Sequence, residues 1–125
     1  MKLYVQEIQG KGRGVLAGED IPSGTLFESA QVVQFPKGQW KYIAKTKLGN
    51  YAYFWGEDLK SGVLALGLGS LYNHSFEPNA RYIRNIKNRT IDFVALRDIR
   101  QDEEIMINYN GDPEDKTPVW FDVEK

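Results

Sequence analysis

Short segments of alternating apolar and polar residues, each ended by a glycine- or proline-containing turn, most constrain how this chain can fold. Residues 3–8 alternate in this way and run into the glycine-rich turn 10–14. Pro22 and Gly24 form a second turn, because proline restricts φ and glycine tolerates positive φ. A period of two residues is typical of strands. The pattern therefore predicts a mostly β fold, with further strands over 25–29, 32–35, 51–55, 63–66, 80–86, 90–96 and 105–108.

One stretch departs from this period. Over residues 39–48, Trp40, Ile43 and Ala44 recur at helical spacing, and a Gly-Asn pair follows as a stop signal. This stretch is the best helix candidate. At 125 residues the chain is long enough for one domain with its own core. Residues 111–125 are rich in Asp, Glu and Pro, and we expect them to form a mobile end.

A weak internal repeat relates residues 17–24 to residues 95–102. Each copy carries an Asp-Ile pair, Asp20-Ile21 in the first and Asp98-Ile99 in the second, followed by a turn. We interpret the two copies as two occurrences of a common type of hairpin rather than as a duplication of the sequence.

Two scarcities exclude whole classes of chemistry. The chain has no cysteine, so it cannot use thiol catalysis, disulfides, iron–sulfur clusters or structural zinc held by cysteines. Its one histidine, His74, excludes any site that needs two imidazoles, and we expect no metal site. Sixteen basic residues against 17 acidic ones argue against a general nucleic-acid binder. No apolar run approaches the ~18 residues of a membrane span, so we expect a soluble intracellular protein, in the cytoplasm, a nucleoid or a host nucleus.

Three local motifs each allow a structural and a functional interpretation. The glycine turn 10–14 leads into a strand-like segment rather than a helix, which argues against a dinucleotide site and leaves a flexible turn or a backbone contact to another ligand. The segment 73–79 holds His74 beside Asn73, either as a hydrogen-bonded structural histidine or as part of a site, and no nucleophile elbow accompanies it. In 102–109, two glutamates precede a short strand that ends at Tyr109, which either caps the core or projects its hydroxyl into a pocket.

Taken together and in this order, the three motifs resemble the SET domain of protein-lysine methyltransferases. The matching segments are 10–17 with 20–24, the Asn-His-Ser-x-x-Pro-Asn sequence at 73–79, and the Glu-Glu-hydrophobic-x-x-x-Tyr sequence at 103–109. The resemblance implies small curved sheets around a pseudoknot-like C-terminal core, with one or two short helices. It implies a SET domain over 1–111 and a tail, 112–125, that folds back on the site or on a partner subunit. The chain looks most like the compact stand-alone viral and bacterial members.

The resemblance also implies an activity. Its methyl donor would be S-adenosyl-L-methionine, with S-adenosyl-L-homocysteine as product and no metal, and its acceptor a lysine on a basic protein tail, histone or histone-like. A homodimer is a further expectation, and neither nucleic acid nor a membrane is expected as a direct partner. The alternatives are a catalytically weak or inactive SET-like module that binds a peptide or partner, and a cofactor-binding domain with a non-lysine acceptor.

The family pattern carries specific residues over. Tyr109 would be the catalytic residue, acting first by positioning the amine, because a phenol with a pKa of about 10 is a poor base at neutral pH. The acceptor must be deprotonated, which costs a free lysine about 4.6 kcal/mol at pH 7, and a dry aromatic channel lowers that cost. The resemblance assigns cofactor binding to Lys11, Gly12, Arg13, Gly14, Asn73, His74, Tyr109 and Trp120.

The acceptor channel is assigned to Tyr53, Tyr72 and Ile107, although ordinary core packing is the alternative for the aromatic residues. Ile107 cannot hold a water molecule by hydrogen bonding, which favours room for more than one methyl group. Many relatives complete the channel with a cysteine-rich zinc segment that this chain lacks. Trp120 and Phe121 stand where a replacement for that segment could fold back over the cofactor or the channel. They could equally dock the tail or form a dimer contact.

Overall fold

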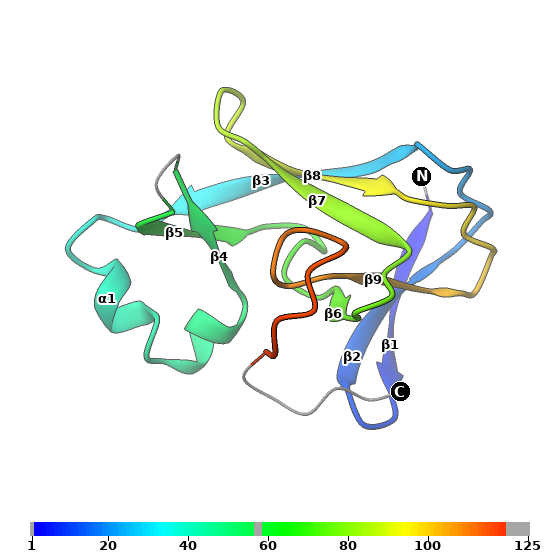
Figure 1. Ribbon diagram of the computed structural model, residues 1–125, viewed down its shortest axis with the longest axis horizontal. Helices are drawn as coiled ribbons and strands as arrows, with labels where there is room; N and C mark the ends of the chain where they lie inside the picture. The colour runs from blue at the N-terminus through cyan, green and yellow to red at the C-terminus, as the bar shows by residue number, and fades with distance from the viewer. Residues whose placement is uncertain (1, 57–58, 120–125) are drawn as a thin grey trace.

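The computed structural model describes residues 2–56 and 59–119, whose strands form two curved sheets (Figure 1). The first sheet has the order β1-β2-β9-β6 and the second the order β4-β5-β3-β8-β7. Two short helical turns lie between β3 and β4. The elements are β1 (Leu3–Ile8), β2 (Gly12–Ala17), β3 (Leu26–Gln34), α1 (Trp40–Ile43), the 3-10 turn η1 (Lys47–Asn50), β4 (Ala52–Trp55), β5 (Ser61–Ala65), β6 (Asn73–His74), β7 (Ala80–Asn85), β8 (Thr90–Ala95) and β9 (Glu104–Ile107). The predicted mostly β fold is confirmed.

The C-terminal strand is threaded through the first sheet. β9 pairs antiparallel with β2 and parallel with the two-residue β6, so it lies between segments far apart in the sequence. The buried side-chain amide of Asn79 forms two hydrogen bonds to the backbone of β9. Its Oδ1 accepts the N–H of Met106 and its Nδ2 donates to the carbonyl of Glu104, each over 2.8 Å. This arrangement brings residue 74 beside residue 107.

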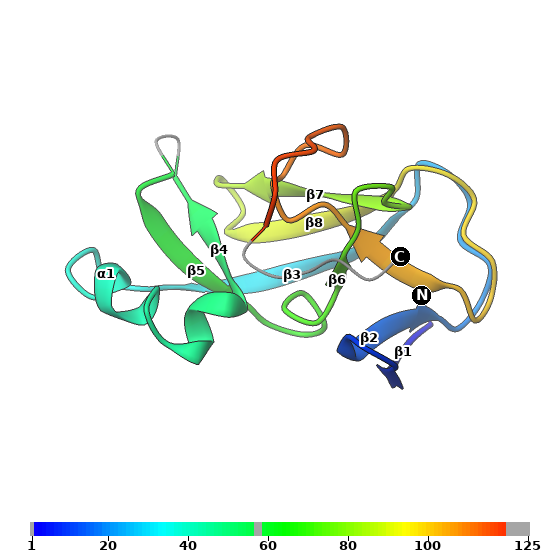
Figure 2. The ribbon, with the colours of Figure 1, turned by 60° about the horizontal axis from the view of Figure 1, so that its bottom comes forward.

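The second sheet curls until its two edge strands approach each other (Figure 2). Arg84 of the edge strand β7 donates from Nε to the carbonyl of Phe54 on the opposite edge, β4, over 2.7 Å. The rings of Tyr53 and Tyr82 meet across the same seam, with centroids 4.9 Å apart. The two strands expected over 25–29 and 32–35 are one continuous strand, β3, whose pairing with β8 shifts register between Leu26 and Glu28.

The internal repeat forms a pair of matching contacts. Ile21 and Ile99 exchange both of their backbone hydrogen bonds, at 2.7 and 2.8 Å. The carboxylate of each repeat's aspartate, Asp20 or Asp98, accepts a backbone N–H from the turn of the other repeat over 2.8 Å. The two segments therefore pair with each other in an approximately two-fold way, and their shared spacing reflects the same set of contacts.

The predicted helix over 39–48 is broken into two short pieces, α1 and η1. Thr46, between them, has an extended backbone with φ −101° and ψ 171°, and its hydroxyl donates to the carbonyl of Ile43 over 2.7 Å. A hydroxyl that bonds to a nearby carbonyl in this way competes with the helix. Trp40 stacks on Phe35 and lies against Gly62 of β5, where a Cβ would approach the indole to 2.4 Å. This packing, rather than helix length, holds the segment against the sheet.

Neither helical piece within the described residues has the length and apolar character needed to cross a membrane.

Candidate active site

The threaded strand places the two C-terminal motifs in direct contact. His74, only 4% exposed, accepts the backbone N–H of Tyr109 at its Nδ1 over 3.0 Å. An imidazole that accepts at Nδ1 carries its proton on Nε2 when neutral. Burial lowers the pKa of His74, which favours this neutral form. The histidine side chain therefore fixes the main chain that carries the terminal tyrosine.

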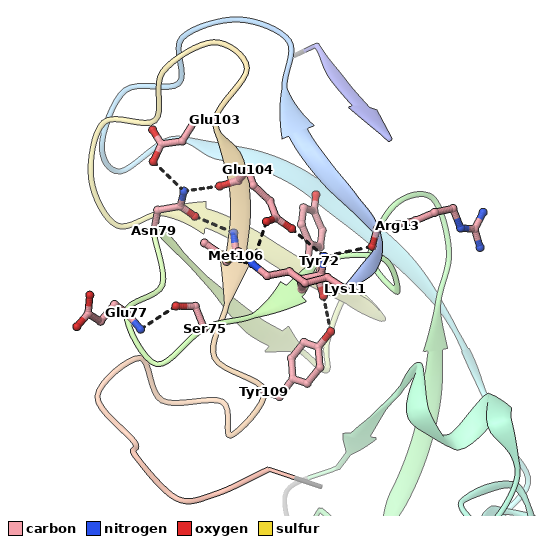
Figure 3. Close-up of polar contacts among 11 residues, drawn as sticks. Lys11, Arg13, Tyr72, Ser75, Glu77, Asn79, Glu103, Glu104, Met106 and Tyr109 are labelled. Atoms are coloured by element: carbon pink, nitrogen blue, oxygen red, sulfur yellow. Dashed lines mark hydrogen bonds and ion pairs between the residues drawn. The ribbon is translucent and has the colours of Figure 1, made fainter. Parts of the chain in front are cut away.

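The hydroxyl of Tyr109 is itself held in place. It donates to the carbonyl of Tyr72 over 2.6 Å, immediately before Asn73 (Figure 3). Burial, followed by the electrostatic influence of Tyr51 and Glu104, raises the pKa of Tyr109 well above its ordinary value. The phenol is thus a hydrogen-bond donor at neutral pH and unsuited to act as a general base.

Tyr109 also lines an aromatic cavity. It has a volume of about 310 Å³ and lies where the edges of the second sheet meet the segment between α1 and β4. Tyr53, Tyr72 and Tyr109 all contribute to it. Its lining comprises Trp40, Ala44, Gly49, Asn50, Tyr51, Ala52, Tyr53, Phe54, Ser70, Tyr72, Tyr82 and Tyr109. Such a cavity can hold a long aliphatic side chain in poorly hydrated surroundings.

A polar cluster gathers around Asn73, the residue that follows Tyr72. Lys11 Nζ is 3.2 Å from Glu104 Oε1 and 3.3 Å from the sulfur of Met106. Asn73 donates from Nδ2 to Glu104 Oε2 over 2.7 Å and to the carbonyl of Arg13 over 3.2 Å. The lysine and glutamate side chains are 20% and 14% exposed, so both charges remain accessible to a ligand.

Two glycines of the first turn differ at this cluster, since Gly14 packs closely against it whereas Gly12 is open to solvent. A Cβ on Gly14 would stand 2.5 Å from Glu104 Oε2 and 2.8 Å from Asn73 Nδ2, so no larger residue fits without displacing them. Gly12 has φ +75° and is exposed, and a Cβ built on it would meet nothing within 4 Å. The main chain of the turn therefore faces open space beside the polar cluster.

The structure brings most of the predicted site residues together. Ile107 is fully buried in the core, pairs with His74 in the sheet, and is not part of the cavity lining. The predictions for Trp120 and Phe121 lie outside the described residues.

Glu104 is the residue of the polar cluster that sequence reasoning missed. Its neighbour Glu103 has the contacts of a surface turn, with an ion pair to Arg97. In β9 the side chains of Glu104 and Met106 are partly exposed, while those of Ile105 and Ile107 are buried. This two-residue alternation was readable in the sequence and could have separated the two glutamates.

Hydrogen bonds join the described part of the tail to the two neighbours of Tyr109 in the chain and to Phe76. Asn108 Nδ2 donates to the carbonyl of Asp115 over 2.6 Å, and Asn110 Nδ2 donates to that of Thr117 over 2.8 Å. Lys116 Nζ donates to the carbonyl of Phe76 over 2.5 Å. Within residues 2–56 and 59–119, no group of three or more acidic or histidine side chains could hold a metal ion.

Comparisons with known proteins give consistent findings. The family model for the SET domain matches residues 12–110. A histone-lysine N-methyltransferase of Schizosaccharomyces pombe, specific for lysine 37 of histone H3, is 39% identical over 123 residues, which is 98% of this chain and 78% of the relative. The crystal structure of a proposed histone methyltransferase from Plasmodium falciparum superposes with a TM-score of 0.63 and 28% identity, covering 86% of this chain and 96% of the other.

Proposed function

Because the chain belongs to the SET-domain family, we propose that it is a protein-lysine N-methyltransferase that uses S-adenosyl-L-methionine to methylate a histone lysine. The observation that carries the proposal is the position of the Tyr109 hydroxyl. It donates to the carbonyl of Tyr72, which lines the aromatic cavity together with Tyr109, and the next residue, Asn73, bonds to Glu104 of the polar cluster.

The aromatic cavity suits the acceptor. The phenols of Tyr53 and Tyr72 are uncharged at neutral pH, and burial raises the pKa of both further above its ordinary value. A lysine side chain that enters such surroundings loses hydration, and its ammonium form is disfavoured. The cavity therefore lowers the cost of obtaining the neutral amine that methyl transfer requires. The Tyr109 hydroxyl donates to a backbone carbonyl beside the cavity, and such a pair of polar atoms can orient the amine.

The polar cluster suits the methyl donor. The methionine end of S-adenosyl-L-methionine carries a carboxylate and an ammonium group, and Lys11 and Glu104 offer charges of the opposite signs. The exposed main chain at Gly12 and the Asn73 amide add backbone and side-chain hydrogen-bonding groups. The residues present thus fit this group, and the close contacts at Gly14 explain why a glycine stands there. When bound, the donor would supply a methyl group on a sulfonium: an unprotonated amine would attack the methyl carbon in line, the methyl–sulfur bond would break, and S-adenosyl-L-homocysteine would leave as the thioether.

The direct test is transfer of a labelled methyl group. The purified protein is incubated with methyl-labelled S-adenosyl-L-methionine and histone H3, and labelled lysine is identified after digestion. Tyr109→Phe removes only the hydroxyl, so we expect the label to fall by about a hundredfold or more, while calorimetry shows S-adenosyl-L-homocysteine binding within about twofold of wild type.

The outcomes separate an enzyme from a binding module. No label with any histone or basic protein, together with intact binding of a histone peptide, would support an inactive module. Equal label on wild type and Tyr109→Phe would remove the hydroxyl from the mechanism. Label on a residue other than lysine would contradict the proposed acceptor.

A further inference from the structure

Glu28 is an acidic residue that a strand irregularity turns toward the interior. The pairing of β3 with β8 shifts register between Leu26 and Glu28, which leaves Phe27 as the extra residue of a β-bulge. A bulge redirects the side chains that follow it, and bulges are frequent beside functional sites. The exposed residue Ser29 continues the outer face of β3, whereas Glu28 is only partly exposed.

The Glu28 carboxylate has a defined set of partners. Oε1 accepts the hydroxyl of Tyr72 over 2.5 Å, and Oε2 accepts the backbone N–H of Leu68 over 2.9 Å. Gly67 has φ +62°, and a Cβ there would lie 2.6 Å from the same Oε2. The loop before Tyr72 therefore closes over the carboxylate and leaves room only for glycine at position 67.

Tyr72 connects this carboxylate to the site. Its side chain is 1% exposed and packs edge-on against Phe27 and tilted against Phe93, with centroids 6.0 and 4.5 Å away. Its hydroxyl end is held by Glu28, and its backbone carbonyl accepts the hydroxyl of Tyr109. One buried residue thus joins the carboxylate of β3 to the phenol beside the cavity.

We propose that Glu28 is a positioning residue for methyl transfer: by holding the Tyr72 hydroxyl and the loop at Leu68, it sets the carbonyl that orients the Tyr109 hydroxyl. This inference rests on the proposed function. Glu28 acts through Tyr72, whose hydroxyl it accepts and whose carbonyl accepts the hydroxyl of Tyr109. Its effect belongs in the rate of the chemical step rather than in the affinity for the donor.

The test uses two single variants and their combination. Glu28→Gln removes the charge that strengthens the hydrogen bond, and Tyr72→Phe removes the hydroxyl that donates it. We expect each to lower kcat by at least about fivefold, with the affinity for S-adenosyl-L-homocysteine within about twofold of wild type. Glu28→Gln leaves the cavity lining intact, so its histone KM should also stay within about twofold of wild type. The double variant should lose little more than either single variant, because both remove the same bond.

Asp92→Asn on β8 is the matched control. The Asp92 carboxylate accepts hydrogen bonds from Ser29, Thr90 and Asn85 in the same sheet. None of these residues lines the cavity or belongs to the polar cluster. We expect this variant to lower the melting temperature and to leave kcat unchanged. A fall in kcat equal to that of Glu28→Gln would show a general effect of weakening the sheet and would overturn the proposal.

A second readout does not depend on turnover. The protein is labelled with fluorotyrosine, and the fluorine resonance of residue 109 is assigned by its loss in Tyr109→Phe. Glu28→Gln and Tyr72→Phe should each shift or broaden that resonance, while Asp92→Asn should not. An unchanged resonance in both variants overturns the positioning role, whereas a changed resonance in a protein that transfers no methyl group refutes only the proposed function.

Discussion

The buried side-chain amide of Asn79 bonds to two backbone groups of the threaded strand β9, and substituting Asn79 gives a quantitative prediction. Asn79 is 1% exposed, and it satisfies the N–H of Met106 and the carbonyl of Glu104, both at 2.8 Å. Asn79→Ala leaves both backbone groups in a space too small for good solvation. Each unsatisfied buried group costs about 1–3 kcal/mol, so the free energy of unfolding should fall by about 2–6 kcal/mol. That is a large fraction of the roughly 5–15 kcal/mol that stabilises an ordinary domain.

Urea unfolding followed by the fluorescence of the three tryptophans measures this change. Asn79→Asp is the informative companion, since it keeps the acceptor for Met106 but replaces the donor with a negative charge. That charge would face the carbonyl of Glu104 and the carboxylate of Glu103, whose Oε2 is 3.4 Å from Nδ2 in the native protein. We expect the aspartate variant to be destabilised at least as much as the alanine variant at pH 7. A loss below about 0.5 kcal/mol in Asn79→Ala, the range of ordinary surface substitutions, would refute the reasoning.

Three further predictions concern the donor site, the histidine and the sheet seam. Gly14→Ala would place a Cβ 2.5 Å from Glu104 Oε2, so calorimetry should show S-adenosyl-L-homocysteine binding weakened by about tenfold, whereas Gly38→Ala, where nothing lies within 4 Å, should bind normally. Because burial lowers the pKa of His74, the unfolded chain takes up the proton first. The urea concentration at the unfolding midpoint should be constant at pH values above about 6.5 and should decrease as the pH is lowered further. Since His74 is the one histidine, a constant midpoint from pH 7 to 5 would contradict its buried, neutral state. Arg84→Met removes the 2.7 Å hydrogen bond across the seam, and urea unfolding should show a loss of about 1 kcal/mol; an unchanged free energy would mean that the seam does not depend on it.

The elements predicted from periodicity were largely correct because each depends on neighbours in sequence. The hairpin of β7 and β8 falls within the predicted strands, and β1 matches its prediction at both ends. The helix expected over 39–48 is also interrupted for a local reason, because the Thr46 hydroxyl bonds to a carbonyl that a continuous helix would have used. The joining of two expected strands into β3 depends instead on its pairing with both β5 and β8.

The residues of the candidate site also fall into those that the sequence indicates and those that only tertiary contacts reveal. Tyr109 and Asn73 stand in recognisable motifs, so the resemblance could assign them before any coordinates were available. Glu28 stands in none of the three motifs, and Glu104 stands in one that does not say which of its two glutamates joins the polar cluster. Each gains its meaning from a partner distant in sequence, Tyr72 in one case and Lys11 in the other. A one-dimensional pattern contains no information about such a pairing unless a known family supplies it.

The order of residues along the chain was enough to establish a β-rich domain, to exclude thiol and two-imidazole chemistry, and to identify three motifs of one family. The first two conclusions follow from side-chain period, turn chemistry and composition, which are local properties, and the third from the resemblance to a known family. No local pattern predicted the threading of β9 between β2 and β6: the resemblance implied a pseudoknot-like core, and the folded molecule shows which residues meet in it. It determines that the imidazole of His74 supports the backbone of Tyr109 and that Tyr72 joins the half-buried carboxylate of Glu28 to the Tyr109 hydroxyl. The physical reason is that buried polar groups must find partners, and the fold alone decides which partners are within reach.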